Sequence, residues 1–150
     1  MSKLTELQDA RAAAKARQDR RMAEATQLCS KFAEAFAIYL EADREKVFFV
    51  KMPMTVDAAT GEIQRDDAPL AFSDGELKTT LVVQIDDSVV FAPFVLATDP
   101  LREAPHVTVG ETQAGVFDLR DGCQAIAEHL FASIKRHYEN CDTVEATLII

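Results

Sequence analysis

The first 39 residues contain neither glycine nor proline and are dense in alanine, leucine, glutamate, lysine, arginine and glutamine. These residue types favour helix, so the segment is predicted to form one helix that ends near Tyr39. At about 1.5 Å per residue, such a helix is about 55 Å long. A compact domain of 150 residues measures only roughly 38 Å across. Part of the helix is therefore expected to lie outside the body and to contact something else.

Apolar side chains recur along the second half of this helix at alternating spacings of three and four residues. This stripe consists of Met22, Ala25, Cys29, Phe32, Phe36 and Tyr39, with Leu28 and Leu40 beside it. Arg11, Gln18 and Arg21 interrupt the same face nearer the N-terminus. We expect residues 22–40 to pack on a sheet, while residues 1–21 fray or form a projecting helical arm. The alternative is that the whole stripe meets a partner helix.

Charge is distributed unevenly along the chain, whose formal net charge is −9. Residues 1–45 carry eight basic and eight acidic side chains, whereas residues 46–150 carry eight basic and seventeen acidic ones. An acidic body repels phosphates, so no nucleic-acid partner is expected. A local basic stretch in the predicted arm is a candidate contact for an acidic protein surface, including the body of a second copy. It comprises Arg11, Lys15, Arg17, Arg20 and Arg21.

Cysteine content and hydropathy indicate the compartment. Cys29, Cys123 and Cys141 are an odd number without CxxC spacing, which is typical of free thiols in a reducing environment. No apolar stretch approaches the ~20 residues needed to span a bilayer, and the polar N-terminus lacks the apolar core of a secretory signal. We therefore expect a cytoplasmic chain without a membrane partner. Its length predicts a single domain over residues 1–150.

From residue 46 the pattern changes to that of β-strands. Hairpin-length links between the segments predict an antiparallel sheet of about five to seven strands. A second helix is predicted at 121–139, capped by Asp121 and stopped by a left-handed Asn140, and a C-terminal strand follows. This order places the fold in the α+β class. Strands are predicted at 47–54, 62–65, 77–85, 88–97, 106–109, 114–119 and 143–150, with loops at 66–76 and 100–105 and turns at Gly61 and at Asp86 and Asp87.

The strands at 47–54 and 89–97 are apolar on both alternating faces. In the second of them, Phe91 and Val95 lie on one face, whereas Ala92 and Phe94 lie on the other. A sheet that is apolar on both faces has to be covered on both. One helix on each face would satisfy this within the monomer. Two helices on the same face would leave the other face for a partner.

No motif assigns catalytic, metal-binding or cofactor-binding residues. Gly110 and Gly115 have phosphate-loop spacing, but Val116 and Phe117 stand where Lys and Ser or Thr are needed. His137 and Cys141 are four residues apart, but the predicted helix end separates them, which disfavours a metal site. The buried-looking cysteines and the paired turn aspartates are interpreted as structural. No cofactor is therefore expected.

Three functions are compatible with the sequence, and an enzyme is disfavoured. The first, which we favour, is a non-enzymatic interaction module: an adaptor, a chaperone-like protein or an assembly subunit. It would act through the long helix and an apolar sheet face on a protein partner or on a second copy. The second is a small-molecule binder or enzyme with an apolar pocket between sheet and helix, and the third is an acidic mimic of nucleic acid. Candidate contact residues for the first are Arg11, Lys15, Arg17, Arg20, Arg21, Met22, Phe32, Phe36 and Tyr39.

Overall fold

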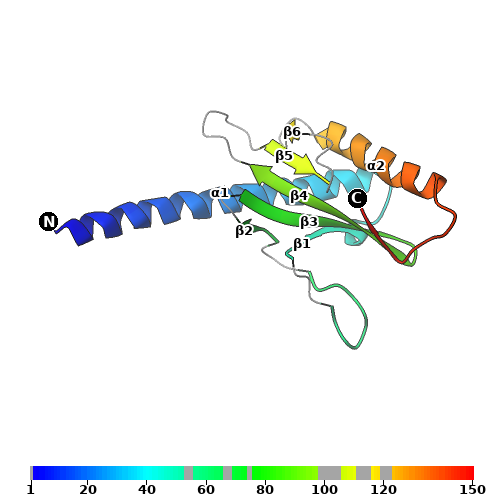
Figure 1. The fold of residues 1–150 in the computed structure, drawn as a ribbon, viewed down its shortest axis with the longest axis horizontal. Helices are drawn as coiled ribbons and strands as arrows, with labels where there is room; N and C mark the ends of the chain where they lie inside the picture. Colours follow the sequence, from blue (N-terminus) through cyan, green and yellow to red (C-terminus); the bar gives the residue numbers. More distant parts are fainter. Residues whose placement is uncertain are drawn as a thin grey trace.

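The computed structural model describes residues 2–52, 56–65, 69–73, 76–97, 106–110, 116–118 and 123–150. Figure 1 shows a body made of a sheet and helices, from which the N-terminal half of the first helix extends. The α+β class, the long N-terminal helix, the second helix and the C-terminal strand are confirmed. In chain order the elements are α1 (Lys3–Tyr39), the 3-10 helix η1 (Arg44–Lys46), β1 (Val47–Val50), β2 (Ala71–Ser73), β3 (Glu76–Ile85), β4 (Ser88–Ala97), β5 (His106–Val109), β6 (Val116–Asp118), α2 (Cys123–Glu139) and β7 (Thr147–Ile149).

Helix α1 is continuous over 37 residues and has defined ends. At its start, the Ser2 hydroxyl accepts a hydrogen bond of 3.1 Å from the Thr5 amide, which satisfies one of the free N–H groups of the first turn. At its end, Glu41 is left-handed with φ +54°. The Glu41 amide donates to the Ile38 carbonyl and the Ala42 amide donates to the Ala37 carbonyl. This pair of bonds is a Schellman motif, which stops the helix without a glycine.

The sheet has seven strands in the order β1-β3-β4-β5-β6, with β2 pairing with β3 and β7 pairing with β4. All described pairs are antiparallel except β4 and β7, which run parallel with Leu148 opposite Val90. The sheet is therefore mixed. The parallel pair arises because the chain reaches β7 through α2 rather than through a hairpin.

The predicted strand bounds agree best with the structure for the longer strands. β3, β4 and β5 lie within one residue of their predicted bounds. The predicted loop at 66–76 is wrong in part, because β2 pairs with β3 and Leu70 is buried. The predicted strand 62–65 is reduced to one isolated bridge between Val56 and Ile63. The predicted strand 47–54 shortens to β1, while residues 53 and 54 lie outside the described part.

The C-terminal region also differs in detail from the prediction. Only Thr147–Ile149 form β7, while Val144 is exposed in the preceding segment. Helix α2 ends at Glu139 as predicted, but Asn140 is not among the described residues with positive φ, so it is not a left-handed stop. Gly61 (φ +72°) and Asp86 (φ +54°) adopt the turn conformations expected of them. The predicted cap Asp121 and the loop at 100–105 lie outside the described residues.

Both helices pack on the same face of the sheet, which we call the inner face. Phe32 of α1 lies at the centre of the shared core, with ring centroids 5.5 Å from Phe94, 6.3 Å from Phe49 and 5.7 Å from Phe36. Of the two arrangements left open by the sequence, the structure has the one with both helices on the same face, and no helix of the described ranges covers the opposite face. Helix α1 buries Ala25, Cys29, Phe32, Ala33, Phe36 and Ala37 in this core, α2 buries Ile126, Ala127, Leu130 and Ile134, and the strands contribute Leu81, Val83, Val90, Ala92, Phe94 and Leu96.

Candidate interaction surfaces

The N-terminal half of α1 extends from the body as a helical arm, defined here as residues 3–21 (Figure 1). No residue of the arm is buried, and the first buried residue of α1 is Ala25. At about 1.5 Å per residue, the arm reaches about 28 Å beyond the body. Leu4 and Leu7 near its end are 64% and 68% exposed. The basic residues Arg11, Lys15, Arg17, Arg20 and Arg21 are all exposed on it.

The predicted contact residues of α1 separate into two groups. Phe32 and Phe36 are fully buried in the chain's own core, so they are not accessible to another protein. Met22 is half-buried at the base of the arm. Tyr39 remains partly exposed and contacts Phe131 of α2 edge-on, with ring centroids 5.9 Å apart. The accessible residues are therefore the basic set of the arm and Tyr39, at opposite ends of the helix.

The outer face of the sheet, opposite the helices, carries a second small cluster of buried apolar side chains. Phe48, Val50, Val82 and Phe91 form it, and the partly buried Ile63 packs against them. The guanidinium of Arg65 lies 4.3 Å from the centre of the Phe48 ring and also donates to the Glu45 carbonyl. The segment 56–65 thus covers one part of the outer face.

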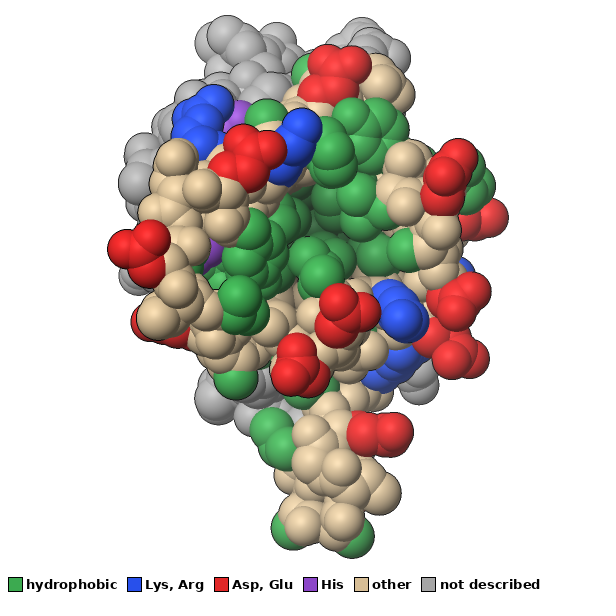
Figure 2. Space-filling view, turned by 90° about the vertical axis from the view of Figure 1, so that its right-hand side faces the viewer, with side chains coloured by type: hydrophobic (Ala, Val, Ile, Leu, Met, Phe, Trp, Pro, Cys, Tyr) green, Lys and Arg blue, Asp and Glu red, His purple; other side chains and the backbone are tan. Residues whose placement is uncertain are grey.

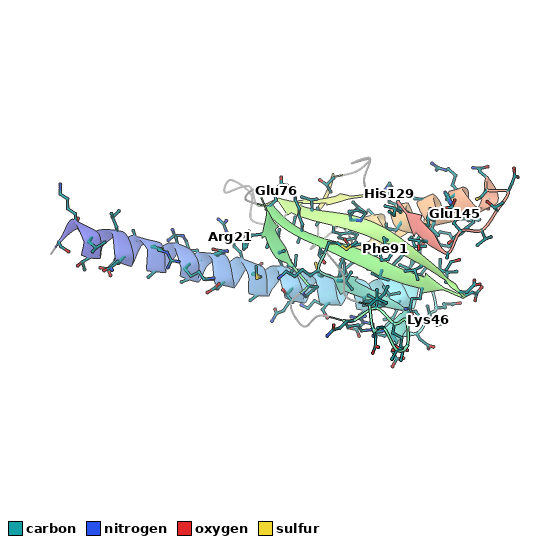
Figure 3. The ribbon with its side chains drawn as sticks, turned by 60° about the horizontal axis from the view of Figure 1, so that its bottom comes forward. Arg21, Lys46, Glu76, Phe91, His129 and Glu145 are labelled. Carbon is teal, nitrogen blue, oxygen red and sulfur yellow. The ribbon has the colours of Figure 1, made fainter. Side chains whose placement is uncertain are left out.

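The rest of the outer face forms a groove of about 580 Å³. The strand register explains its composition, because Lys78 lies opposite Val95, Thr80 lies opposite Pro93, and Phe91 lies opposite Ile149. Phe91, labelled in Figure 3, lies in the middle of the sheet. Among the described residues, Lys78 is the only charged one in the lining, so this part of the groove is mainly apolar with one cation. It is lined by Met52, Ala71, Lys78, Thr79, Thr80, Phe91, Pro93, Phe94, Val95, Thr147 and Ile149.

A second pocket of about 400 Å³ lies between α1, η1 and β1. Cys29 is in its lining, together with Arg44 and Arg65. Burial disfavours the charged thiolate and raises the pKa of the Cys29 thiol from 9.0 to about 12. Cys29 is therefore protonated at neutral pH, which agrees with its interpretation as a small buried hydrophobe rather than a nucleophile.

The other candidates for chemistry are not brought together. His137 and Cys141 both line a shallow pocket of about 400 Å³ at the end of α2. The Cys141 thiol donates there to the Thr143 carbonyl. Within the described ranges, no three His, Cys, Asp or Glu side chains are grouped as a metal site would require. Three aromatic side chains of the sheet and α2 are also spread out: Phe94 is in the inner core, Phe91 is in the outer cluster and Phe131 is exposed on α2.

The end of the body opposite the arm carries another apolar area. Figure 2 shows hydrophobic side chains gathered in a hollow at this end, surrounded by charged side chains that are more often acidic than basic. Helix α1 ends on this side of the body (Figure 1), where Tyr39 and Phe131 are partly exposed and contact each other. We call this area the hollow.

Comparisons with protein-family models, with curated proteins and with solved structures find no match. Among the described residues, no helix is both long enough and apolar enough to cross a lipid bilayer. The arm, the groove and the hollow are surfaces at which the described part of the chain exposes apolar or basic side chains.

Proposed function

We propose that this chain is a non-enzymatic interaction module, an adaptor or assembly subunit that binds protein through the arm and through the groove on the outer sheet face. The observation that carries the proposal is the placement of both helices on the inner face. It leaves a helix without a body beneath it and, within the described part of the chain, an apolar sheet face without a helix above it. A chaperone-like protein would use the same two surfaces.

The arm supports the proposal because little within the chain stabilises it. Isolated helices shorter than about 12–15 residues are marginal in water, and most helical stability comes from tertiary packing. The packed part of α1 supplies the nucleus, and the alanine-rich sequence favours propagation. The exposed ion pair between Lys15 and Asp19, at 2.9 Å, adds only a few tenths of a kcal/mol. A partner packed along the arm would provide the burial that the body does not.

The groove supports it because of its size and composition. Pockets of roughly 300–1,000 Å³ with mostly apolar walls and a few polar groups are typical binding sites. Continuous apolar patches on monomers commonly mark interaction sites. An apolar segment of a protein partner that carries an acidic side chain beside its apolar residues would fit the groove. Its carboxylate would pair with Lys78, which lies between Val95 of β4 and Ala71 of β2.

A matched pair of substitutions tests this function. Val95→Asp places a charge in the groove, whereas Val144→Asp makes the same change at an exposed residue outside its lining. We expect specific proteins to co-purify with the tagged wild-type chain and with Val144→Asp, and to be depleted at least tenfold with Val95→Asp, by quantitative mass spectrometry. If no protein distinguishes the two variants, the groove is not a protein-binding surface.

One observation favours a second candidate function. The described lining of the groove, mainly apolar with one cation, also suits a small apolar molecule with an anionic group. The hydrocarbon part of such a molecule would pack against the apolar walls, and its anion would pair with Lys78. Native mass spectrometry of the purified chain distinguishes the two candidates. A bound mass present in wild type, absent in Val95→Asp and unaccompanied by a protein partner would support small-molecule binding instead.

A further inference from the structure

We propose that the arm of one copy docks in the hollow of a second copy, so that copies of this chain associate head to tail. The inference rests on the proposed function, since it names the partner of one of the two surfaces. It commits to a second copy because the chain's own body has the charge and the apolar area that the arm requires.

The arm and the rest of the chain carry opposite net charges. The arm carries six basic and three acidic side chains, a net charge of +3, whereas residues 22–150 carry ten basic and twenty-two acidic ones, a net charge of −12. The sequence thus joins a cationic helix to an anionic body. Opposite potentials of this kind steer association and fix orientation, and they act over a Debye length of about 10 Å at 0.1 M salt.

The acidic side chains are concentrated where the hollow lies. Three structural features meet at this end of the body: the end of α1, the turn between β3 and β4, and the segment that follows α2 (Figure 1). In Figure 3, Glu145 lies at this end together with Lys46, whereas Arg21, the last residue of the arm, lies away from it. The basic side chains of these features are fewer, namely Arg44, Lys46, Lys135 and Arg136, and Lys135 pairs with Glu139 at 3.7 Å. The exposed acidic ones are Glu41, Asp43, Glu45, Asp86, Asp87, Glu139, Asp142 and Glu145.

The apolar side chains of the arm and those of the hollow are also arranged to fit each other. Leu4, Leu7, Arg11 and Lys15 follow one another at spacings of three and four residues, so they share one face of the arm. This face presents two exposed leucines near its end and two cations behind them. The hollow has the matching arrangement, with apolar side chains in the middle and mainly acidic ones around them (Figure 2). The leucines would enter the hollow, and the cations would meet its rim.

The other possible docking sites for the arm are less suitable. The groove on the outer face contains Lys78, which repels a cationic helix. Two arms side by side would bring two charges of +3 together. The chain's own hollow is out of reach, because the arm points away from it along the long axis of the molecule (Figure 1). A contact between opposite ends is heterologous, so each added copy presents a new arm and a new hollow, and open chains of copies result.

Light scattering on the full chain tests the inference. At 0.1 M salt, we expect the weight-average mass to increase with protein concentration beyond that of a dimer. At 1 M salt, where the Debye length is about 3 Å, we expect it to return to the monomer mass. A monomer at every concentration, or a dimer that neither grows nor responds to salt, would overturn the inference.

Two sets of variants identify the contact. Arg11→Gln with Lys15→Gln keeps helix propensity and should weaken association roughly tenfold, whereas the control Glu6→Gln with Asp9→Asn should leave it equal or stronger. A chain lacking residues 2–21 retains the hollow and all residues that are buried in the described part of the structure, but it has no arm. Added to the full chain, it should cap growing assemblies and lower their mass.

If the armless chain is not incorporated while the full chain associates, arms contact arms and the inference is wrong. If copies of the chain do not associate but Val95→Asp and Val144→Asp still retain different proteins, the inference is wrong and the proposed function is still supported. Conversely, if the two variants retain the same proteins, the groove is not a protein-binding site, and the association measured by light scattering is unaffected by that result. The two results are therefore separable.

Discussion

Replacing Phe32 with alanine is expected to lower the free energy of unfolding by about 3–5 kcal/mol. The Phe32 ring is fully buried and contacts rings from its own helix, from β1 and from β4. Removing it leaves a cavity between α1 and the sheet that rigid strands cannot fill. Because small domains are stable by only about 5–15 kcal/mol, this single change removes a large share of the total.

Urea unfolding followed by circular dichroism measures this effect, and Leu7→Ala is the matched control. Leu7 lies on the same helix but is exposed, so its replacement should change stability by no more than about 0.5 kcal/mol. Equal effects of the two substitutions would show that residues 22–39 do not pack on the sheet as described. The comparison is best made at high salt, where the proposed association does not contribute.

Replacing Val82 with aspartate is expected to cost about 3–5 kcal/mol, because it leaves an uncompensated charge in a buried site. Val82 is fully buried on the outer face, between Phe48 and Phe91. This cluster is separate from the main core and lies next to the groove. The substitution therefore tests whether the outer face is closed at this point.

Val95→Asp and Val144→Asp are controls for this substitution, since the chemical change is the same. Val95 is half-buried in the groove and Val144 is exposed, so both variants should remain folded and lose less than about 1 kcal/mol. Thermal unfolding of the three proteins ranks them. A Val95→Asp variant as unstable as Val82→Asp would contradict an open groove.

The elements that the sequence predicts well are those specified by local pattern. The absence of glycine and proline before Tyr39 and the three-four spacing of the stripe predict α1 and its packed half. The alternation in β3 and β4 predicts both strands within one residue. The separation of α1 into a packed half and a solvated half also follows from the sequence, because Arg11, Gln18 and Arg21 interrupt the stripe.

The features that the sequence predicts poorly depend on contacts between distant segments. A buried apolar stripe and an interface stripe have the same pattern, so Phe32 and Phe36 were candidates for partner contact although the chain's own core contains them. Strand β2 is only three residues long, and its pairing with β3 defines it. The periodicity of α2 likewise does not specify the face of the sheet on which it packs, because that face depends on tertiary contacts.

The groove is the part of the candidate site that sequence reasoning missed. The alternation of β3 does place Lys78, Thr80 and Val82 on one face, so the position of a lysine on an otherwise apolar surface was available as a signal. The groove itself depends on how far the segment 56–65 extends over that face and on where β7 pairs along β4. Those limits follow from the register of Ile149 against Phe91 and from the packing of Ile63, both of which are long-range.

Site-specific photo-crosslinking in living cells tests most directly whether the chain binds proteins through the groove and the arm. A photoreactive phenylalanine analogue would be placed at Val95 and Ile149 in the groove and at Leu7 in the arm, with the exposed helix positions Ala35 and Ala125 as controls. We predict discrete protein adducts from the groove and arm positions, with the second copy among those from Leu7, and none from the controls. Adducts from Ala35 or Ala125 together with unreacted groove and arm positions would contradict the account.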